Sequence, residues 1–359
     1  MALSFDLSAL TRPDLRDLQP YDPHPMPGMI KLDANENPFD FPEEVRSYLW
    51  KCFHSESFTR YPDPAAQDLR RELAEYTGVT AENIIAGNGS DELILYLMLA
   101  FGTGRRVLIA TPTFSMYRIH ARIAGAQPVD VPRLPNFALD VDRLLEEAAR
   151  PEVSMLVICS PNNPTGNAAL PADIEALLAG TRALVVVDEA YIEFGGVSCV
   201  PLLKRYPNLV ILRTLSKAFG LAGLRVGYLL ADQPVIRELL KVKQPFNLND
   251  FSQMAALAVL KCRESFFSLV EKILQNKMVL LEGMNEIPGV EVFPGVTNFL
   301  LFRTPLPAET VYRRLVDQGI LIRNVAGPGL ERCLRVTVGT PEENAIFLAK
   351  LKLVMEMAE

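Results

Sequence analysis

Three short aliphatic segments constrain the fold of this 359-residue chain more than any other feature. They are Met155–Cys159, Leu184–Val187 and Leu209–Leu212. Each segment is apolar throughout, a pattern typical of strands that are buried on both faces of a parallel sheet. The helical or loop spacers between them imply right-handed crossovers. The sequence therefore predicts an α/β fold with a mostly parallel sheet between helices.

A polar residue follows each of these segments at a position where chemistry is expected. Asn163 lies in CSPNNPTG (159–166), Asp188 in LVVVDEAY (184–191) and Lys217 in TLSKAFG (214–220). In an open α/β sheet, ligands bind beyond the carboxyl ends of the strands. An amine, a carboxylate and a carboxamide that meet there fit a pyridoxal phosphate site. In such a site the lysine forms a Schiff base and an acid partners the pyridinium nitrogen.

Each of these residues also has a simpler structural explanation when it is considered singly. Lys217 resembles a solvated lysine at the start of a helix, and Asp188 resembles a helix cap. Two residues near Lys217 in the sequence favour the cofactor site. Ser216, which is adjacent, can donate a hydrogen bond to a phosphate, and Arg225, eight residues later, can donate two parallel hydrogen bonds to it. Tyr191 is three residues after Asp188 and can donate to the phenolic oxygen of the cofactor.

A glycine-rich turn, AGNGSDE (86–92), leads from a predicted strand into an apolar helix. Its backbone amides suit an anion at a helix N-terminus, although Ser90 can also serve simply as a cap. The dinucleotide fingerprint fails because Glu92 stands at the last glycine position. We expect the carboxylate of Asp91 to face away from a phosphate or to contact a neighbour. Phe114, after another strand, can stack on the pyridine ring or pack in the core.

Composition excludes several classes of function. The net charge is −7 and no basic stripe offsets it, which argues against binding of nucleic acid. The longest apolar run, Leu93–Phe101, is too short to span a bilayer, and no signal-peptide pattern is present, so we expect a cytoplasmic protein. The five cysteines are scattered and the three histidines form no ligand-like pair. This pattern predicts free thiols and neither a metal site nor a Ser-His-Asp triad.

The hydrophobic pattern also predicts the domain organisation. Residues 1–34, rich in proline and aspartate, are expected to form an extended arm. Residues 35–245 are predicted to form the large cofactor-binding domain, because the alternation of helix and strand breaks near 232 and again at 244–247. Residues 246–359 are predicted to form a smaller α+β domain, which begins with one long helical stretch at about 251–285.

The motifs together carry a clear resemblance to a known family. The chain resembles the fold-type I pyridoxal-phosphate aminotransferases and, within them, the histidinol-phosphate aminotransferases, over essentially its whole length. The motifs that carry the resemblance are PYDPHPMPG (20–28), LDANENP (32–38), RYPDP (60–64), GNGSDE (87–92), TPTFSMY (111–117), SPNNPTG (160–166), VDEAY (187–191), TLSKAFGLAGLRVGY (214–228) and LRVTVGT (334–340).

The resemblance implies a role for each matching residue. Lys217 would carry the cofactor covalently and act as the general base, Asp188 would bind the pyridine nitrogen, and Asn163 and Tyr191 would bind the phenolic oxygen. The residues expected around the cofactor phosphate and ring are Ser90, Asp91 (through its backbone), Ser216, Arg225 and Phe114. Tyr61 would reach the cofactor phosphate of the other subunit of a homodimer. The residues expected to hold the substrate phosphate are Arg335, Arg323 and Tyr21.

The implied reaction is transfer of an amino group from L-histidinol phosphate to 2-oxoglutarate, which gives imidazole-acetol phosphate and glutamate in histidine biosynthesis. Two rivals share much of this site: an aromatic amino-acid aminotransferase and threonine-phosphate decarboxylase. Arg335 can hold a carboxylate as readily as a phosphate, so it does not separate them. A regulatory module that senses pyridoxal phosphate is disfavoured, because the N-terminal arm is too short and too acidic to be a DNA-binding segment.

Overall fold

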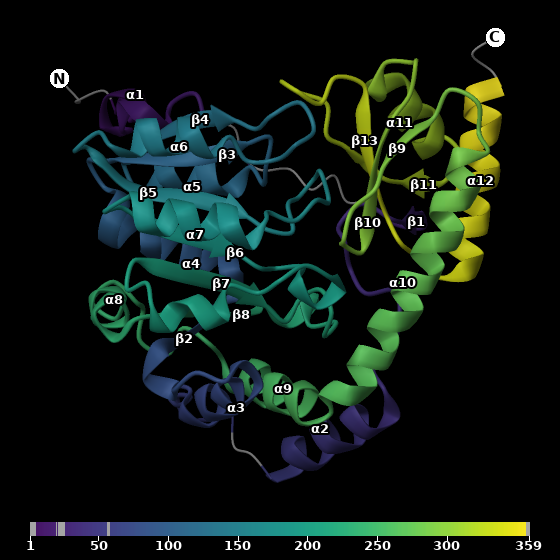
Figure 1. Ribbon diagram of the computed structural model, residues 1–359. Helices are drawn as coiled ribbons and strands as arrows, with labels where there is room; N and C mark the ends of the chain where they lie inside the picture. Colours follow the sequence, from purple (N-terminus) through teal and green to yellow (C-terminus); the bar gives the residue numbers. More distant parts are fainter. Residues whose placement is uncertain (1–4, 19, 21–25, 56–57, 357–359) are drawn as a thin grey trace.

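The computed structural model describes residues 5–18, 20, 26–55 and 58–356. A seven-stranded sheet with helices on both faces forms the larger part, and a four-stranded sheet with its own helices forms the smaller part (Figure 1). The long helix α10 (Arg263–Asn285) rises from beside the larger part to the smaller sheet. None of the described helices is long and apolar enough to cross a membrane.

The remaining elements have the following bounds. The strands are β1 (Ile30–Lys31), β2 (Ile84–Asn88), β3 (Arg106–Thr111), β4 (Gln127–Pro132), β5 (Val153–Cys159), β6 (Leu184–Asp188), β7 (Leu209–Thr214), β8 (Val226–Ala231), β9 (Glu291–Phe293), β10 (Phe299–Arg303), β11 (Ile320–Leu321), β12 (Arg323–Asn324) and β13 (Cys333–Thr337). The helices are α1 (Leu7–Leu10), α2 (Glu43–Ser55), α3 (Gln67–Thr77), α4 (Gly89–Leu97), α5 (Met116–Ile123), α6 (Val141–Ala148), α7 (Pro171–Gly180), α8 (Gln233–Leu239), α9 (Asp250–Lys261), α11 (Ala308–Val316) and α12 (Pro341–Glu356).

The large sheet has the strand order β2-β8-β7-β6-β5-β3-β4. Strands β3 to β7 are parallel to one another, whereas β8 is antiparallel to both β7 and β2. The parallel register places Cys159 beside Asp188, and Asp188 beside Leu212. The carboxyl ends of β5, β6 and β7 therefore meet at one edge, and the predicted α/β fold with a mostly parallel sheet between helices is confirmed; this sheet has seven strands.

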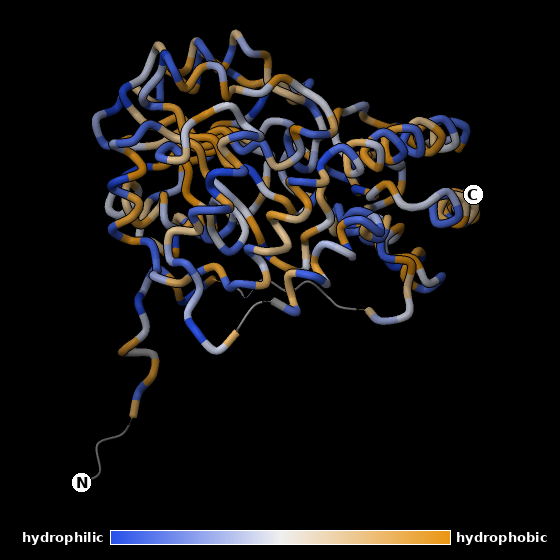
Figure 2. Tube along the Cα trace, turned by 90° about the horizontal axis from the view of Figure 1, so that it is seen from below, coloured by the Kyte–Doolittle hydropathy of each residue, from blue (hydrophilic) through white to orange (hydrophobic). Residues whose placement is uncertain are grey.

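The core explains why these strands are apolar throughout. On β5, Leu156 and Ile158 face one apolar cluster, whereas Met155 and Val157 face another. Helices α6 and α7 contribute to the first cluster, and α4 and α5 contribute to the second. Figure 2 shows the hydrophobic segments gathered inside the larger part, with hydrophilic residues on the outer turns. A strand with helices on both sides needs apolar residues on both faces.

The smaller part differs from the prediction in one element. The stretch 251–285 is two helices rather than one, because the chain bends at Cys262 (φ −101°, ψ 26°) between α9 and α10. Helix α9 packs on α2 and α3, whereas α10 packs on α12 and β9. The four-stranded sheet has the order β12-β13-β10-β9 and is antiparallel, and β1 pairs with β11 in a separate parallel sheet. The expected domain boundaries stay predictions.

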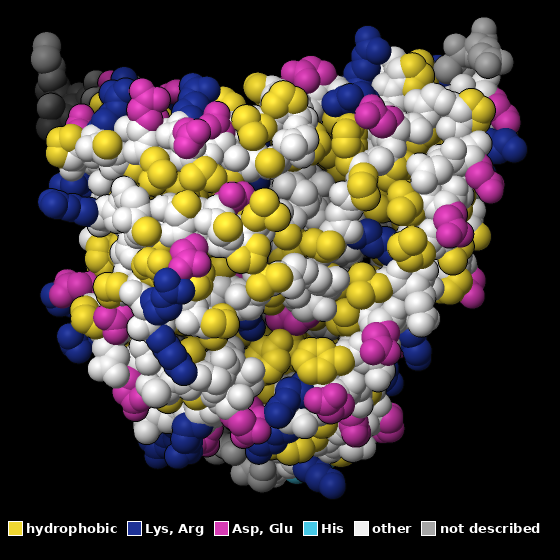
Figure 3. Space-filling view, viewed as in Figure 1, with side chains coloured by type: hydrophobic (Ala, Val, Ile, Leu, Met, Phe, Trp, Pro, Cys, Tyr) yellow, Lys and Arg dark blue, Asp and Glu magenta, His cyan; other side chains and the backbone are white. Residues whose placement is uncertain are grey.

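The N-terminal arm also differs in a small way. Residues 7–10 form the single turn of helix α1 in a segment that was expected to have no regular helix. The arm is tied to the end of helix α5 by Arg12, whose guanidinium donates to the carbonyl oxygen of Ile123 at 2.8 Å. On the face shown in Figure 3, acidic and basic side chains are interspersed, as expected for a chain without a basic stripe.

Candidate active site

Asp188 occupies the last position of β6 and is buried. Its Oδ2 accepts a hydrogen bond from the hydroxyl of Tyr117 at 2.6 Å, and its Oδ1 accepts from the backbone N–H of Ala190 at 3.0 Å. Burial raises the pKa of Asp188 to about 6, and the bond from Tyr117 opposes that rise. The carboxylate is therefore mostly ionised at neutral pH and can pair with a buried cation.

Lys217 lies just beyond β7, in the segment that connects β7 to β8. Its Nζ donates to the carbonyl oxygen of Ala34 at 2.8 Å. Burial, and next the positive charge of Arg335, lower the pKa of Lys217 to about 8. A substantial fraction of this amine is therefore neutral near physiological pH, as a nucleophile or a general base requires.

Tyr191 and Asn163 are held by residues from outside the large sheet. The hydroxyl of Tyr191 accepts a hydrogen bond from Nδ2 of Asn35 at 2.9 Å, and Oδ1 of Asn163 accepts from Nη1 of Arg335 at 2.5 Å. Arg335 lies on β13, is buried, and also donates to the carbonyl oxygen of Asp33. These contacts link the segment after β5 to an arginine of the small sheet, and the segment after β6 to Asn35.

The start of α4 provides a second cluster. Arg225 Nη2 pairs with Asp91 Oδ2 at 2.9 Å, so the carboxylate of Asp91 contacts a neighbour, as expected. At two positions beside this ion pair, a side chain larger than that of glycine would not fit. A Cβ at Gly89, where φ is +79°, would lie 2.5 Å from Nη2 of Arg225, and a Cβ at Gly227 would lie 2.3 Å from the backbone nitrogen of Ser90. The guanidinium and the first amides of the helix can therefore approach the same anion.

The remaining predicted residues are placed as follows. Phe114 is partly buried and its ring meets that of Tyr117 edge-on, with centroids 5.6 Å apart. Arg323 on β12 lies opposite Arg335 in the antiparallel register of the small sheet. Tyr61 is 81% exposed and stacks on Phe246, with ring centroids 4.6 Å apart. Tyr21 lies outside the described residues.

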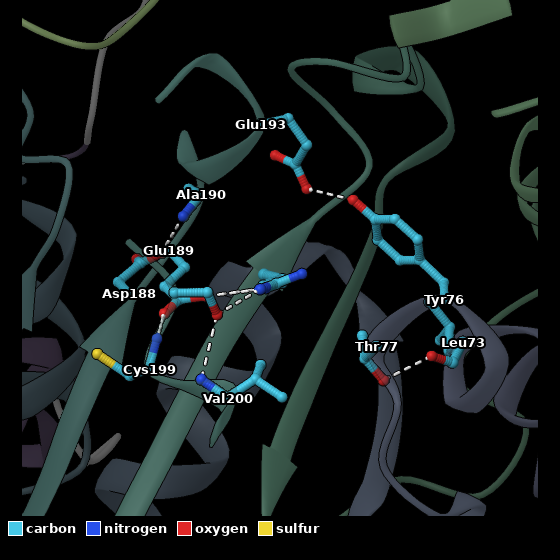
Figure 4. A network of polar contacts seen from close by, with 11 residues as sticks. Leu73, Tyr76, Thr77, Asp188, Glu189, Ala190, Glu193, Cys199 and Val200 are labelled. Atoms are coloured by element: carbon cyan, nitrogen blue, oxygen red, sulfur yellow. Dashed lines mark hydrogen bonds and ion pairs between the residues drawn. The ribbon is translucent and has the colours of Figure 1, made fainter. Parts of the chain in front are cut away.

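A buried polar network lies behind the end of β6 (Figure 4). Glu189 Oε2 pairs with Arg213 Nη2 at 2.8 Å and accepts from the hydroxyl of Ser198 at 2.9 Å. Its Oε1 accepts from the backbone N–H of Cys199 at 2.5 Å. Glu193, which follows two residues after Tyr191, accepts from the hydroxyl of Tyr76 at 3.2 Å. The network therefore fixes the segment that carries Asp188 and Tyr191.

Sequence reasoning missed two residues that touch the site directly. Tyr117 bonds to Asp188, and Asn35 bonds to Tyr191. Both lie within motifs that carried the family resemblance, TPTFSMY and LDANENP, but no role was assigned to either. The only available signal was their presence in these motifs, because no local spacing connects them to their partners.

The residues present fit pyridoxal phosphate. The hydroxyl of Ser216 is buried and has no hydrogen-bond partner among the residues that the structure describes, so a donor is available next to Lys217. Arg225 and the start of α4 add a cation and backbone amides for a phosphate. Asp188 supplies a buried acceptor for a protonated ring nitrogen, and Lys217 supplies the amine. The phosphate, the ring nitrogen and the aldehyde of pyridoxal phosphate thus each have a matching group in this chain.

Comparison with known proteins agrees with this arrangement. The family model described as aminotransferase class I and II matches residues 27–351. The chain belongs to the class I and II aminotransferases. Its predicted fold class and its predicted nature as an aminotransferase are therefore confirmed. Within this family the chain keeps both the large parallel sheet and the small antiparallel sheet.

Several aminotransferases are similar over nearly the full length. Histidinol-phosphate aminotransferase 1 of Carboxydothermus hydrogenoformans is 44% identical over 335 residues, which cover 93% of this chain and 95% of that protein. The histidinol-phosphate aminotransferase of Caldanaerobacter subterraneus subsp. tengcongensis is 41% identical over 348 residues, which cover 96% of this chain and 99% of that protein. The crystal structure of histidinol-phosphate aminotransferase from Sinorhizobium meliloti, in complex with pyridoxal-5'-phosphate, matches with a TM-score of 0.82 at 27% identity. The match covers 92% of this chain and 91% of that chain.

Proposed function

We propose that this aminotransferase uses pyridoxal phosphate to transfer an amino group from L-histidinol phosphate to 2-oxoglutarate, in histidine biosynthesis. The observation that carries the proposal is the amine of Lys217, whose pKa is lowered to about 8, at the same sheet edge as the buried carboxylate of Asp188. The substrate is supported by the names of the full-length relatives, and the cofactor by the Sinorhizobium meliloti complex.

The residues of the chain would divide the work at the cofactor. Bound pyridoxal phosphate supplies an electron sink for the electron pair left when a proton leaves the substrate carbon. Lys217 would hold the cofactor and, once displaced by the substrate amine, its neutral Nζ would take up that proton. Asp188 would keep a proton on the ring nitrogen by accepting its hydrogen bond. Asn163 and Tyr191 would orient the phenolic oxygen, and Phe114 would pack on the ring.

Two separate anion sites would orient the ligands. Ser90, Ser216, Arg225 and the backbone of Asp91 would hold the cofactor phosphate at the start of α4. The substrate phosphate would be held by Arg335, with Arg323 opposite it in the small sheet and Tyr21 from the N-terminal arm. With the cofactor phosphate and the substrate phosphate held at separate sites, the reacting carbon of the substrate would be fixed relative to Lys217. Such orientation of reacting groups contributes strongly to catalysis.

We also propose that the active unit is a homodimer in which Tyr61 reaches the cofactor phosphate of the partner subunit. An exposed aromatic surface supports this proposal. It consists of Trp50, Phe53, Phe58, Tyr61, Phe246 and Phe251, all at least 36% exposed. Exposed aromatic groups of this kind mark surfaces that another protein covers. We place the reaction in the cytoplasm, where the five cysteines would stay reduced.

Substitution of Lys217 tests the central assignment. We expect Lys217→Ala to fold normally but to lose both the visible absorbance of the lysine-linked cofactor and nearly all turnover, because no other amine would hold the cofactor or move the proton. Absorbance spectra and circular dichroism would measure the two properties. Lys204→Ala, at an exposed lysine, is the matched control. Normal transamination by the Lys217 variant would show that the assignment is wrong.

A panel of amine donors with 2-oxoglutarate as acceptor tests the substrate. We expect kcat/KM for histidinol phosphate to exceed that for phenylalanine by at least about a hundredfold, since a phosphate held by the buried Arg335 and the half-buried Arg323 would form several charge-assisted bonds. Preference for phenylalanine would indicate an aromatic aminotransferase. Release of carbon dioxide from threonine phosphate would indicate a decarboxylase.

A further inference from the structure

Lys277 on α10 is a buried lysine that the proposed reaction does not use. It is 5% exposed, and among the described residues no carboxylate lies within salt-bridge distance of it. Its Nζ donates to the carbonyl oxygen of Thr297 at 2.8 Å and also to that of Gly295. Burial lowers its pKa to about 8. Because a buried ammonium without a counter-charge is costly, an apolar side chain would serve stability better at this position.

The two carbonyl groups belong to residues 294–298, which we call the 294–298 loop. This loop connects β9 to β10 beside α10 (Figure 1). The backbone N–H of Val296 donates to the carbonyl oxygen of Gly166 at 2.8 Å. A Cβ at Gly295 would lie 2.6 Å from the carbonyl carbon of Gly166, so the two backbones are in direct contact. Gly166 ends the SPNNPTG segment that carries Asn163, and the loop therefore supports that segment.

The far end of the 294–298 loop reaches two more parts of the site. Nδ2 of Asn298 donates to the carbonyl oxygen of Asn35 at 3.0 Å, and Asn35 in turn donates to Tyr191. The ring centroid of Phe299, the next residue, lies 5.2 Å from that of Tyr191. The guanidinium carbon of Arg335 lies over the Phe299 ring, 5.2 Å from its centroid. A shift of this loop would thus move Phe299 and the guanidinium of Arg335 above it, which is the group proposed to hold the substrate phosphate.

We propose that Lys277 is a positioning residue for substrate binding, because its ammonium holds the 294–298 loop against the Asn163 segment, Asn35 and Phe299. The inference rests on the proposed transamination and adds a residue to it. Asp188 is held by the large sheet, and the segment of Tyr191 is held by the network behind β6. Arg335, which would hold the substrate phosphate, instead packs over Phe299 at the end of the loop. Removing the ammonium should therefore affect binding of the amine donor more than the chemical step.

The test compares Lys277→Met with wild type and with Lys272→Met, the same change at an exposed position of α10. For Lys277→Met we expect KM for histidinol phosphate to rise on the order of tenfold, while kcat and the affinity for pyridoxal phosphate change less than about threefold. In the cofactor-free chain, hydrogen exchange at the amide of Val296 should become faster. The Lys272 variant should match wild type in all four measurements.

A second variant keeps the test decisive if Lys277→Met does not fold. Asn298→Ala retains Lys277 but removes the bond to Asn35, and it should raise KM selectively in the same way. An unchanged KM in either folded variant, or equal losses in kcat and cofactor affinity, would overturn the proposal. Absence of transamination in the wild type would instead reject the proposed function, and the exchange measurement would still report on the loop.

Discussion

At the scale of single residues, ionisation in this site depends on partners from distant parts of the chain. Burial alone would favour the neutral form of Asp188, and the hydrogen bonds from Tyr117 and Ala190 partly restore its charge. For Lys217, burial and the nearby Arg335 act in the same direction and favour the neutral amine. The site thus keeps an ionised acid and a partly neutral amine within the same pH range.

Tyr117→Phe tests this balance at the acid. Because the hydrogen bond from Tyr117 lowers the pKa of Asp188, its loss should raise that pKa above about 6, so the carboxylate becomes protonated at a higher pH. A bond to a charged group contributes about 1.5–3 kcal/mol, which corresponds to a shift of about one pH unit or more. Binding of pyridoxal phosphate to the cofactor-free chain should weaken as Asp188 becomes protonated. In a pH titration of this binding, the weakening should therefore occur at a correspondingly higher pH in Tyr117→Phe than in wild type. Tyr206→Phe, on the surface beside Glu175, should leave the profile unchanged.

At the scale of elements, the ends of β6 and β7 are joined by a buried ion pair. Arg213 on β7 and Glu189 after β6 have side chains that are 8% and 1% exposed. Glu189 also accepts from Ser198 and Cys199, so it closes the segment 189–199 back onto the sheet (Figure 4). The strand ends therefore present Asp188 and Tyr191 from a rigid frame rather than from a free loop.

Arg213→Met should lower the free energy of unfolding by about 3–5 kcal/mol, because it leaves the carboxylate of Glu189 buried without its cation. Arg205→Met breaks a comparable pair with Glu175 whose side chains are 62% and 38% exposed, and should cost less than about 1 kcal/mol. Urea denaturation at neutral pH measures both values. Similar losses in the two variants would contradict the view that the buried pair braces the site.

At the scale of the whole molecule, the site lies where the large sheet, the small sheet and the residues around Asn35 come together. Arg335 from the small sheet bonds to Asn163 of the large one, and Asn35 bonds to Tyr191. Tyr61 and the exposed aromatic surface lie on the outside of the same chain. We therefore expect the complete site to need a second copy of this chain.

Mixing two inactive variants tests this expectation. Lys217→Ala lacks the amine, and Tyr61→Ala is expected to bind pyridoxal phosphate too weakly to be active when the cofactor is limiting. If the subunits exchange, half of the dimers contain one of each variant, and one of their two sites is intact. Activity should then recover to about a quarter of wild type. No recovery, with dimers confirmed by analytical ultracentrifugation, would place Tyr61 outside the partner's site.

The strands and their polar ends could be predicted because the information is local. A run such as Met155–Cys159 must be buried on both faces, and Asn163, Asp188 and Lys217 follow such runs within a few residues. The break between α9 and α10 at Cys262 could not be predicted, because the apolar pattern continues across it without a proline or glycine. The division there follows from packing on two different parts of the molecule.

By itself, the sequence determined the class of fold, and it predicted which residues would gather at the carboxyl edge of the large sheet. Only the tertiary structure decided their partners. Tyr117 and Asp188 are 71 residues apart in the chain, Asn35 and Tyr191 are 156 apart, and Asn163 and Arg335 are 172 apart. Hydrogen bonds between such distant residues depend on how whole elements pack, and no periodicity in the sequence records that packing.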